Sequence, residues 1–438
     1  MKQLFIKAAV CFIHLQFILP PAGLIAQTDS IPNFRYYDKR GVNVFETPKQ
    51  PVADFKGISV RIGGGFAQSF QSLSHSNSAE SKGANSLYGI SAGFNTAMAN
   101  LIMDVKLAPG MRFNLTSYLS SRYHNETRFN TAYLQIDKLP FNSALFDRLM
   151  KYMTIRLGQM EINYGDAHFR RSDGGLTIYN PFMENYILDT YTREIAAEFY
   201  ARKRSLFAMA GISNVMNSGN IDSLVATTYD ANVHKSPAFY FKAGIDNSVD
   251  EWFRIRLSGS VYHNGSSGGN TLFTGDNAGS NYFMVMEKNG HGITYATNAF
   301  SGRIDPEFTK KVNACQLNLF LKLLGVEVFA SWEAASGRTA YEDSERHLEQ
   351  FAIDWVYRFA GKEDLFAGSR YNVVSAQLRG MPEEVKIDRA VFTLGYYFTK
   401  NILVKCEFVN QLYHKFPLED YRNKGEFKGF MMQAVVGF

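Results

Sequence analysis

The chain has 438 residues, of which 46% are hydrophobic and 20% charged, and its formal net charge is +5. This mild positive charge is spread along the chain, which argues against a nucleic-acid-binding protein. After the N-terminus there is no apolar run of about 20 residues, which excludes a bundle of membrane-spanning helices. The 36 Phe, 24 Tyr and 35 Gly, with only 12 Pro, favour many strands joined by turns.

Residues 1–26 are predicted to be a secretory signal peptide. Lys2 and Lys7 precede an apolar stretch from Ala8 to Leu19, and small residues follow before Gln27. Cys11 lies inside the apolar stretch and not at the cleavage site, which argues against a lipid-anchored protein. Residues 27–56 form a lead-in rich in tyrosine and charge, predicted to be either a periplasmic tail or a segment that enters the pore of the domain that follows.

Residues 57–438 are dominated by segments of about ten residues with a period of two, the length that crosses an outer membrane at a tilt. In 111–119, for example, Phe113 and Leu115 share one face while Arg112 and Asn114 share the other. About sixteen strands (range 14–18) are predicted, near residues 58–70, 96–107, 110–121, 130–138, 152–162, 194–202, 204–213, 237–247, 251–263, 311–322, 325–334, 349–358, 368–378, 388–398, 401–411 and 427–438. The predicted fold is all-β, a transmembrane antiparallel β-barrel.

The lengths of the predicted connections alternate. Short ones such as 202–204 and 399–401 separate long polar ones, at 71–86, 164–193, 214–236, 264–310, 335–348 and 412–426. Short periplasmic turns and long extracellular loops are the layout of an outer-membrane barrel, so the protein is expected in the cell outer membrane after export. Residues 142–152 have helical spacing and are predicted to form a short helix at one periplasmic turn.

The chain ends on Phe438, in a strand that alternates large apolar with small or polar residues. The segment resembles the closing strand of Gram-negative outer-membrane barrels, whose terminal phenylalanine sits in the interfacial aromatic girdle and is read by the barrel-assembly machinery. That machinery and outer-membrane lipid are therefore expected partners. Cys315 and Cys406 are far apart, in strand-like sequence, and are predicted to point at lipid, with neither a disulfide nor a metal site.

A barrel of this size is expected to leave a water-filled interior, so its inward side chains should be polar and reveal any charge preference. The residues predicted to line the pore are Arg61, Arg112, Arg156, Arg254, Arg256, Arg389, Lys405, Glu198 and Glu407. The predicted inward set has a mild basic excess, which favours small polar or anionic solutes with a modest anion preference. The alternative is a wall whose charges simply pair with one another.

The loop that follows the strand at 152–162 carries both charge signs close together, in Asp166, His168, Arg170, Arg171 and Asp173. Residues 156–166, Arg-Leu-Gly-Gln-Met-Glu-Ile-Asn-Tyr-Gly-Asp, resemble the porin superfamily that includes the phosphate-selective porins. The resemblance implies that this third loop folds into the barrel and narrows it, with Arg170 and Arg171 as constriction residues opposed by Asp166 and Asp173, and it implies a homotrimer. The chain departs from that family in lacking a run of closely spaced lysines and arginines. The alternative is a solvated surface loop.

The sequence therefore predicts a porin-like channel for passive diffusion, needing no cofactor. One alternative is a non-conducting barrel that serves as a subunit or anchor of a secretion or surface assembly. A second is an outer-membrane lipid-acting enzyme, for which Ser121, His124 and Asn125 are the only candidate set. No nucleophile elbow, phosphate-binding glycine loop or metal motif supports an enzyme.

Overall fold

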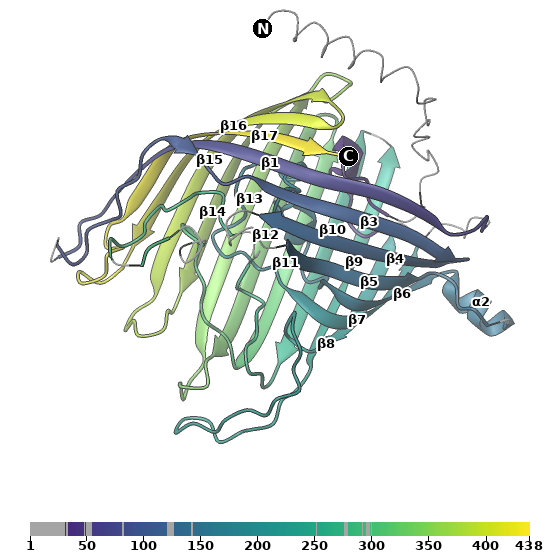
Figure 1. Cartoon of the computed structure of the whole chain (residues 1–438), viewed down its shortest axis with the longest axis horizontal. Helices are drawn as coiled ribbons and strands as arrows, with labels where there is room; N and C mark the ends of the chain where they lie inside the picture. Colours follow the sequence, from purple (N-terminus) through teal and green to yellow (C-terminus); the bar gives the residue numbers. More distant parts are fainter. Residues whose placement is uncertain are drawn as a thin grey trace, which may run out of the picture.

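In the computed structural model the chain forms one antiparallel β-barrel (Figure 1). The structure describes residues 31, 34–47, 49, 55–80, 83–120, 127–141, 143–250, 252–275, 279–290, 292–294, 298 and 300–438. Its strands are β1 Ser59–Ser76, β2 Gly93–Phe94, β3 Met98–Ala108, β4 Met111–Ser120, β5 Thr127–Ile136, β6 Met153–Glu161, β7 Arg193–Lys203, β8 Leu206–Ser213, β9 Ala238–Asp250, β10 Phe253–Asn264, β11 Lys311–Leu323, β12 Val326–Arg338, β13 Arg346–Phe359, β14 Leu365–Ala376, β15 Val385–Thr399, β16 Ile402–His414 and β17 Glu426–Gly437. Because β2 has two residues and lies beside β1, sixteen full strands make the wall.

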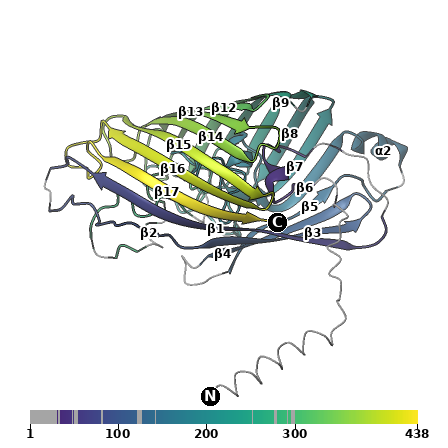
Figure 2. The same ribbon diagram turned by 90° about the horizontal axis from the view of Figure 1, so that it is seen from above.

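Each full strand pairs with its neighbours in sequence, and β1 closes the ring by pairing with both β3 and β17. Closure leaves no exposed sheet edge, as a strand structure in lipid requires. The connections β7–β8, β11–β12 and β15–β16 contain two residues each, whereas the longer connections 162–192, 214–237 and 265–310 begin and end at the opposite ends of the strands (Figure 2). We call the end with the short turns the periplasmic end.

The outward face of the barrel is an apolar belt. Side chains such as Ile62, Leu101, Leu257 and Leu394 point outward and are exposed, because the period-two pattern places every second residue on this face. Exposed aromatic side chains mark the periplasmic ends of the strands, as an interfacial girdle does: Tyr152, Trp252, Tyr357, Phe359, Tyr396, Phe398 and Phe438. Cys406 is exposed and Cys315 half-buried. No helix in the described part of the chain is long and apolar enough to cross a membrane.

The predicted strands are confirmed, with differences at their ends. β1 runs to Ser76, six residues beyond its predicted end, so the first long loop starts later than expected. β12 and β13 likewise extend into the segment predicted as loop 335–348, which shortens that loop to 339–345. The predicted periplasmic helix is α2, Ala144–Met150, between β5 and β6. The signal peptide lies outside the described residues.

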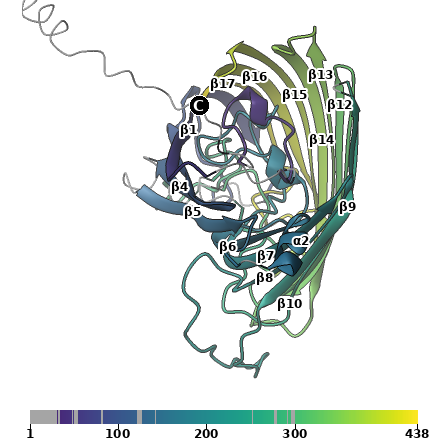
Figure 3. The same ribbon diagram turned by 90° about the vertical axis from the view of Figure 1, so that its right-hand side faces the viewer.

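The prediction of a wide water-filled interior is wrong for this structure. Segments from the loops at 162–192 and 265–309, and the described lead-in residues 34–47 and 49, lie inside the wall (Figure 3). A large cluster of buried apolar side chains joins these segments to the inner faces of the strands. The described residues of the lead-in therefore enter the barrel and do not form a free periplasmic tail.

Candidate functional site

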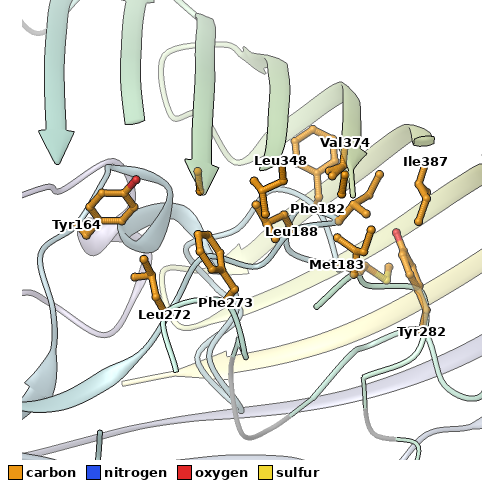
Figure 4. Close-up of a cluster of buried hydrophobic side chains, with 14 of the residues drawn as sticks. Tyr164, Phe182, Met183, Leu188, Leu272, Phe273, Tyr282, Leu348, Val374 and Ile387 are labelled. Carbon is orange, nitrogen blue, oxygen red and sulfur yellow. The ribbon is translucent and has the colours of Figure 1, made fainter. Parts of the chain in front are cut away.

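Residues 162–192, which we call the inner loop, connect β6 to β7 and fold into the barrel. Phe182, Met183, Ile187 and Leu188 of this loop are almost completely buried, and they pack beside Leu348, Val374 and Ile387 of the wall (Figure 4). Burial of each such side chain contributes roughly 1.5–3 kcal/mol. The loop is thus a packed part of the interior, with its own share of the hydrophobic core.

Wall side chains also hold the backbone of the inner loop. The ammonium of Lys405 donates to the carbonyls of Thr177, Asn180 and Phe182, at 3.0–3.2 Å. Two further wall residues act in the same way: Arg389 donates to the carbonyl of Asn185 at 2.8 Å, and the carboxylate of Glu407 accepts from the backbone N–H of Met183 at 2.7 Å. Buried backbone groups must find partners, so these polar wall residues position the loop and do not face open water.

Asp166, at the start of the inner loop, belongs to a buried ion cluster. Its carboxylate lies 2.6 Å from Lys242 and 2.7 Å from Arg256, both on the wall and fully buried. Glu46, from the lead-in, contacts the same two cations at 3.0 and 2.7 Å, and Asp246 contacts Arg256 at 3.1 Å. We call Glu46, Asp166, Lys242, Asp246 and Arg256 the shared ion cluster, since the lead-in, the inner loop and the wall all contribute to it.

Electrostatics within the cluster favour the charged carboxylates. Burial by itself raises the pKa of both Asp166 and Glu46, but the adjacent Lys242 and Arg256 outweigh it. The pKa of Asp166 therefore lies far below its usual range, and that of Glu46 falls to about 2. Both groups are ionised at any physiological pH.

The other predicted constriction residues also lie inside the barrel, but their partners differ from those expected. Arg170 is buried between Phe320 and Phe329 and lies 3.8 Å from Glu327, while Arg171 lies 2.6 Å from Asp189. The expectation that Asp166 opposes Arg170 and Arg171 is wrong, because Asp166 turns to the wall cations. A surface placement of this loop is also wrong.

His168 and Asp173 lie beside β5 and β6. The imidazole of His168 contacts the carboxylate of Glu161 and the amide oxygen of Asn163. Asp173 accepts from Asn130 and from the hydroxyl of Tyr191, both at 3.3 Å.

The predicted pore-lining residues all lie on the inner wall, but most are buried and bonded. Arg61 pairs with Asp104, Arg112 with Asp137, and Arg254 with Asp246. Glu198 accepts from three groups: the hydroxyls of Tyr200 and Tyr240 and the backbone N–H of Asn163. The alternative of a mutually paired lining therefore describes these residues better than an open, charged wall.

A cavity of about 190 Å³ lies between the inner loop, the lead-in and strands β3–β6. Its lining is Phe34, Arg35, Tyr37, Phe45, Glu46, Thr47, Ile102, Asn114, Thr116, Asn130, Thr131, Tyr133, Arg156, Met160, Glu161, Asn163, His168, Phe169, Arg171, Asp173, Leu176 and Tyr179. A smaller cavity of about 30 Å³ shares Glu46, Thr47 and Arg156 with it and extends to Lys49, Tyr152 and Arg202 near the periplasmic turns. Because they share three lining residues, the two cavities adjoin, and the smaller one lies nearer the periplasmic end.

Arg35 and Arg156 line the cavity without a carboxylate in direct contact, although Glu46 and Glu198 lie near enough to stabilise the charge of Arg156. Arg35 donates to the carbonyls of Gly41 and Phe169, at 2.7 and 2.8 Å, and lies 3.6 Å from the ring centre of Tyr179. Arg156 donates to Gln135 and Tyr200, at 3.1 and 3.4 Å. All these partners are neutral, and in the described part of the chain neither guanidinium forms an ion pair. Sequence reasoning included Arg156 but missed Arg35, because the path of the lead-in leaves no period-two pattern.

No metal site is found among the described residues. They contain no group of three histidine, cysteine or acidic residues that could hold a metal ion. Ser121, His124 and Asn125, the candidate set for a lipid-acting enzyme, lie outside the described residues.

No protein-family model and no curated protein sequence matches the chain. Among solved structures, the chain is similar to an anion-selective porin from Comamonas acidovorans, with a TM-score of 0.53, 9% identity, and coverage of 87% of this chain and 100% of that one. It is also similar to the outer membrane channel DcaP of Acinetobacter baumannii, with a TM-score of 0.50, 14% identity, and coverage of 89% and 100%. At such identities the likeness is one of fold.

The fold and its apolar belt define the class of protein. A closed sixteen-stranded antiparallel barrel with a lipid-facing outer surface has the fold of an outer-membrane barrel, and the outer membrane is where such a barrel resides.

Proposed function

We propose that the protein is an outer-membrane channel for passive diffusion of small polar solutes, with a modest preference for anions, and that it is not an enzyme. The observation that carries the proposal is the cavity beside β3–β6, together with the smaller cavity that adjoins it nearer the periplasmic end. Because packed side chains fill most of the remaining described interior, the proposed route is narrow and lies against this side of the wall.

The proposed selectivity comes from Arg35 and Arg156. Two guanidinium charges without carboxylate partners raise the local concentration of anions in a confined aqueous space. Three carboxylates, Glu46, Glu161 and Asp173, line the same cavity and balance the charge of its three arginines, so the proposed preference comes from the positions of Arg35 and Arg156. A modest anion preference is therefore expected, without strong selection for one ion.

Single-channel recording in planar bilayers tests the proposal. The wild-type protein is expected to conduct with an anion-to-cation permeability ratio above one, and Arg156→Gln should lower that ratio toward one. Lys322→Gln is the matched control: Lys322 is also a wall cation, but it pairs with Glu363 at 2.7 Å near the periplasmic rim, outside the cavity lining. Absence of conductance would contradict the channel, and an unchanged ratio in Arg156→Gln would contradict the route.

The anchoring of the inner loop favours a second candidate, a non-conducting barrel that serves as a subunit or anchor of a surface assembly. Direct bonds from Lys405, Arg389 and Glu407 to the loop backbone suit a permanently filled interior. This candidate predicts no conductance and a partner protein that co-purifies with the barrel.

The finer assignments are also proposals. A relation to the phosphate-selective porins is supported by residues 156–166 and by the inward fold of the third loop. A homotrimer is supported by the similar fold of OmpT of Vibrio cholerae, described in a trimer form, with a TM-score of 0.50 and 9% identity over 87% of this chain and 100% of that one. Recognition by the assembly machinery is supported by the alternating apolar pattern of β17 and by the exposed ring of Phe438 beside it.

A further inference from the structure

The described lead-in residues 34–47 and 49, which we call the N-terminal strap, cross the periplasmic mouth of the barrel. At one side the ammonium of Lys39 lies 2.6 Å from Asp364 in the β13–β14 turn, and its backbone N–H donates to the carbonyl of Lys400 at 2.8 Å. In the middle Glu46 reaches β9 and β10 through the shared ion cluster. At the other side Lys49 lies 3.1 Å from Asp137, just after β5. These anchors belong to separate arcs of the wall, so the strap spans the opening.

The strap is also the periplasmic boundary of the cavity. Phe34, Arg35, Tyr37, Phe45, Glu46 and Thr47 belong to the strap, and all of them line the cavity. The remaining lining comes from the wall and the inner loop. Without the strap, the cavity would lose this side and open toward the periplasm.

The strap takes no part in the strand ladder of the wall. It forms no strand, and its one regular element is the three-residue turn η1, Lys39–Gly41. Lys39, Glu46 and Lys49 anchor it through side-chain ion pairs. Side chains of the wall and the inner loop also donate to its backbone carbonyls: Tyr179 to Tyr36 at 2.6 Å, Arg254 to Asn43 at 2.8 Å and Arg202 to Glu46 at 3.2 Å. Release of the strap would break these bonds but no pairing between strands.

We propose that the N-terminal strap is an autoinhibitory stopper: it narrows the periplasmic end of the route, and its release widens the channel. The inference rests on the proposed function and adds to it a restricted state of the route. Glu46 is the central contact, because its carboxylate bridges Lys242 and Arg256, the same pair that holds Asp166 of the inner loop.

The test replaces residues 34–49 by a glycine–serine linker of equal length, which keeps every wall strand. Conductance is expected to rise at least threefold. The matched control replaces α2, Ala144–Met150, in the same way, since α2 also lies at the periplasmic end but contributes nothing to the cavity lining. A point variant, Glu46→Gln with Lys49→Gln, keeps the chain length and the apolar contacts and should show a smaller rise in the same direction.

A second readout does not depend on conduction. Thr116 on β4 is buried and lines the cavity, so Thr116→Cys can be labelled with a membrane-impermeant maleimide, in a protein with Cys315 and Cys406 replaced by alanine. Replacing the strap should raise the labelling rate at least tenfold, and replacing α2 should not.

The two readouts separate the two proposals. Faster labelling without any conductance would support the stopper and overturn the proposed channel. Unchanged labelling in a conducting protein would overturn the stopper, and so would an equal rise in the α2 control.

Discussion

At the scale of single residues, the interior is held together by carboxylates that are buried in contact with cations. Glu46 and Asp166 share Lys242 and Arg256, and all four side chains are shielded from solvent. Breaking such a pair costs about 3–5 kcal/mol, because it leaves a buried charge without a partner. Protonation removes the negative charge of the carboxylate and so breaks the ion pair. The stability of the shared ion cluster therefore depends on pH.

The first prediction concerns that pH dependence. Glu46 has a pKa of about 2 in the folded protein, against about 4.3 for an unperturbed glutamate. Because the folded pKa is the lower one, the stabilisation is present above about pH 4 and is lost as the pH falls toward 2. Glu46→Gln should therefore conduct more than wild type by a constant factor from pH 8 to pH 5, and the ratio should begin to fall below about pH 4 and approach one near pH 2.

Single-channel conductance of both proteins, recorded in the same salt at each pH, checks this. The ratio isolates Glu46 from the other groups that face it, which are Lys242, Arg256, Asp166 and Asn163. If the ratio reached one between pH 7 and pH 5, the carboxylate would not be held by these cations.

At the scale of elements, the strands were predictable and the filling of the barrel was not. The alternation of apolar and polar residues shows which side of a strand faces lipid, so all sixteen full strands follow from the sequence. The helix α2 follows from the helical spacing of its apolar residues. The apolar residues of the inner loop follow no regular spacing. The path of its backbone is set by contacts with the side chains of Lys405, Arg389 and Glu407, which lie far away in the sequence. Pairings of that kind leave no pattern within a single segment.

A signal for the filled interior was nevertheless present in the sequence. The inner faces of β14–β17 carry apolar residues, among them Val374, Val391, Leu403 and Val435, all almost completely buried. A strand whose two faces are both apolar faces lipid on one side and a protein core on the other. The loop itself holds Phe182, Met183, Ile187 and Leu188, which a solvated loop would not need. The two patterns together point to a plugged barrel.

The second prediction tests the inner loop as an element. Asp166→Asn leaves Lys242 and Arg256 with one carboxylate fewer, so the start of the loop should detach from the wall. Arg170 and Arg171, buried in the wild type, then become sites for trypsin. Cleavage there should be at least tenfold faster, as followed by mass spectrometry of the fragments.

The matched control is Asp222→Asn. Asp222 also pairs with a lysine, Lys235, at 2.6 Å, but it is exposed to solvent, where such pairs contribute little. Equal cleavage rates in wild type and Asp166→Asn would show that the ion cluster does not hold the loop.

At the scale of the whole molecule, closure of the barrel depends on the pairing of its first strand, β1, with its last, β17, which we call the seam. β17 pairs with β1, and the last residue continues the ladder: Gly64 donates to the carbonyl of Phe438 at 2.9 Å, and Phe438 donates back at 3.1 Å. Gly63 and Gly64 lack side chains where the ring of Tyr37 and the terminal residue come close, since a Cβ on Gly63 would lie 2.3 Å from that ring. The strap, the C-terminus and the closure of the wall meet at this point.

The third prediction separates stability from assembly at the seam. The two bonds of Phe438 to Gly64 use backbone atoms, so Phe438→Ala keeps them, and the ring that it removes is 57% exposed. The purified variant should therefore refold in detergent and resist heat nearly as wild type does.

The amount of folded barrel in the outer membrane should fall several-fold, because the assembly machinery is proposed to read the terminal ring. Phe398→Ala is the control, since Phe398 is another exposed aromatic on a periplasmic strand end. If the cellular yields of the two variants matched, the terminal ring would serve only as part of the aromatic girdle.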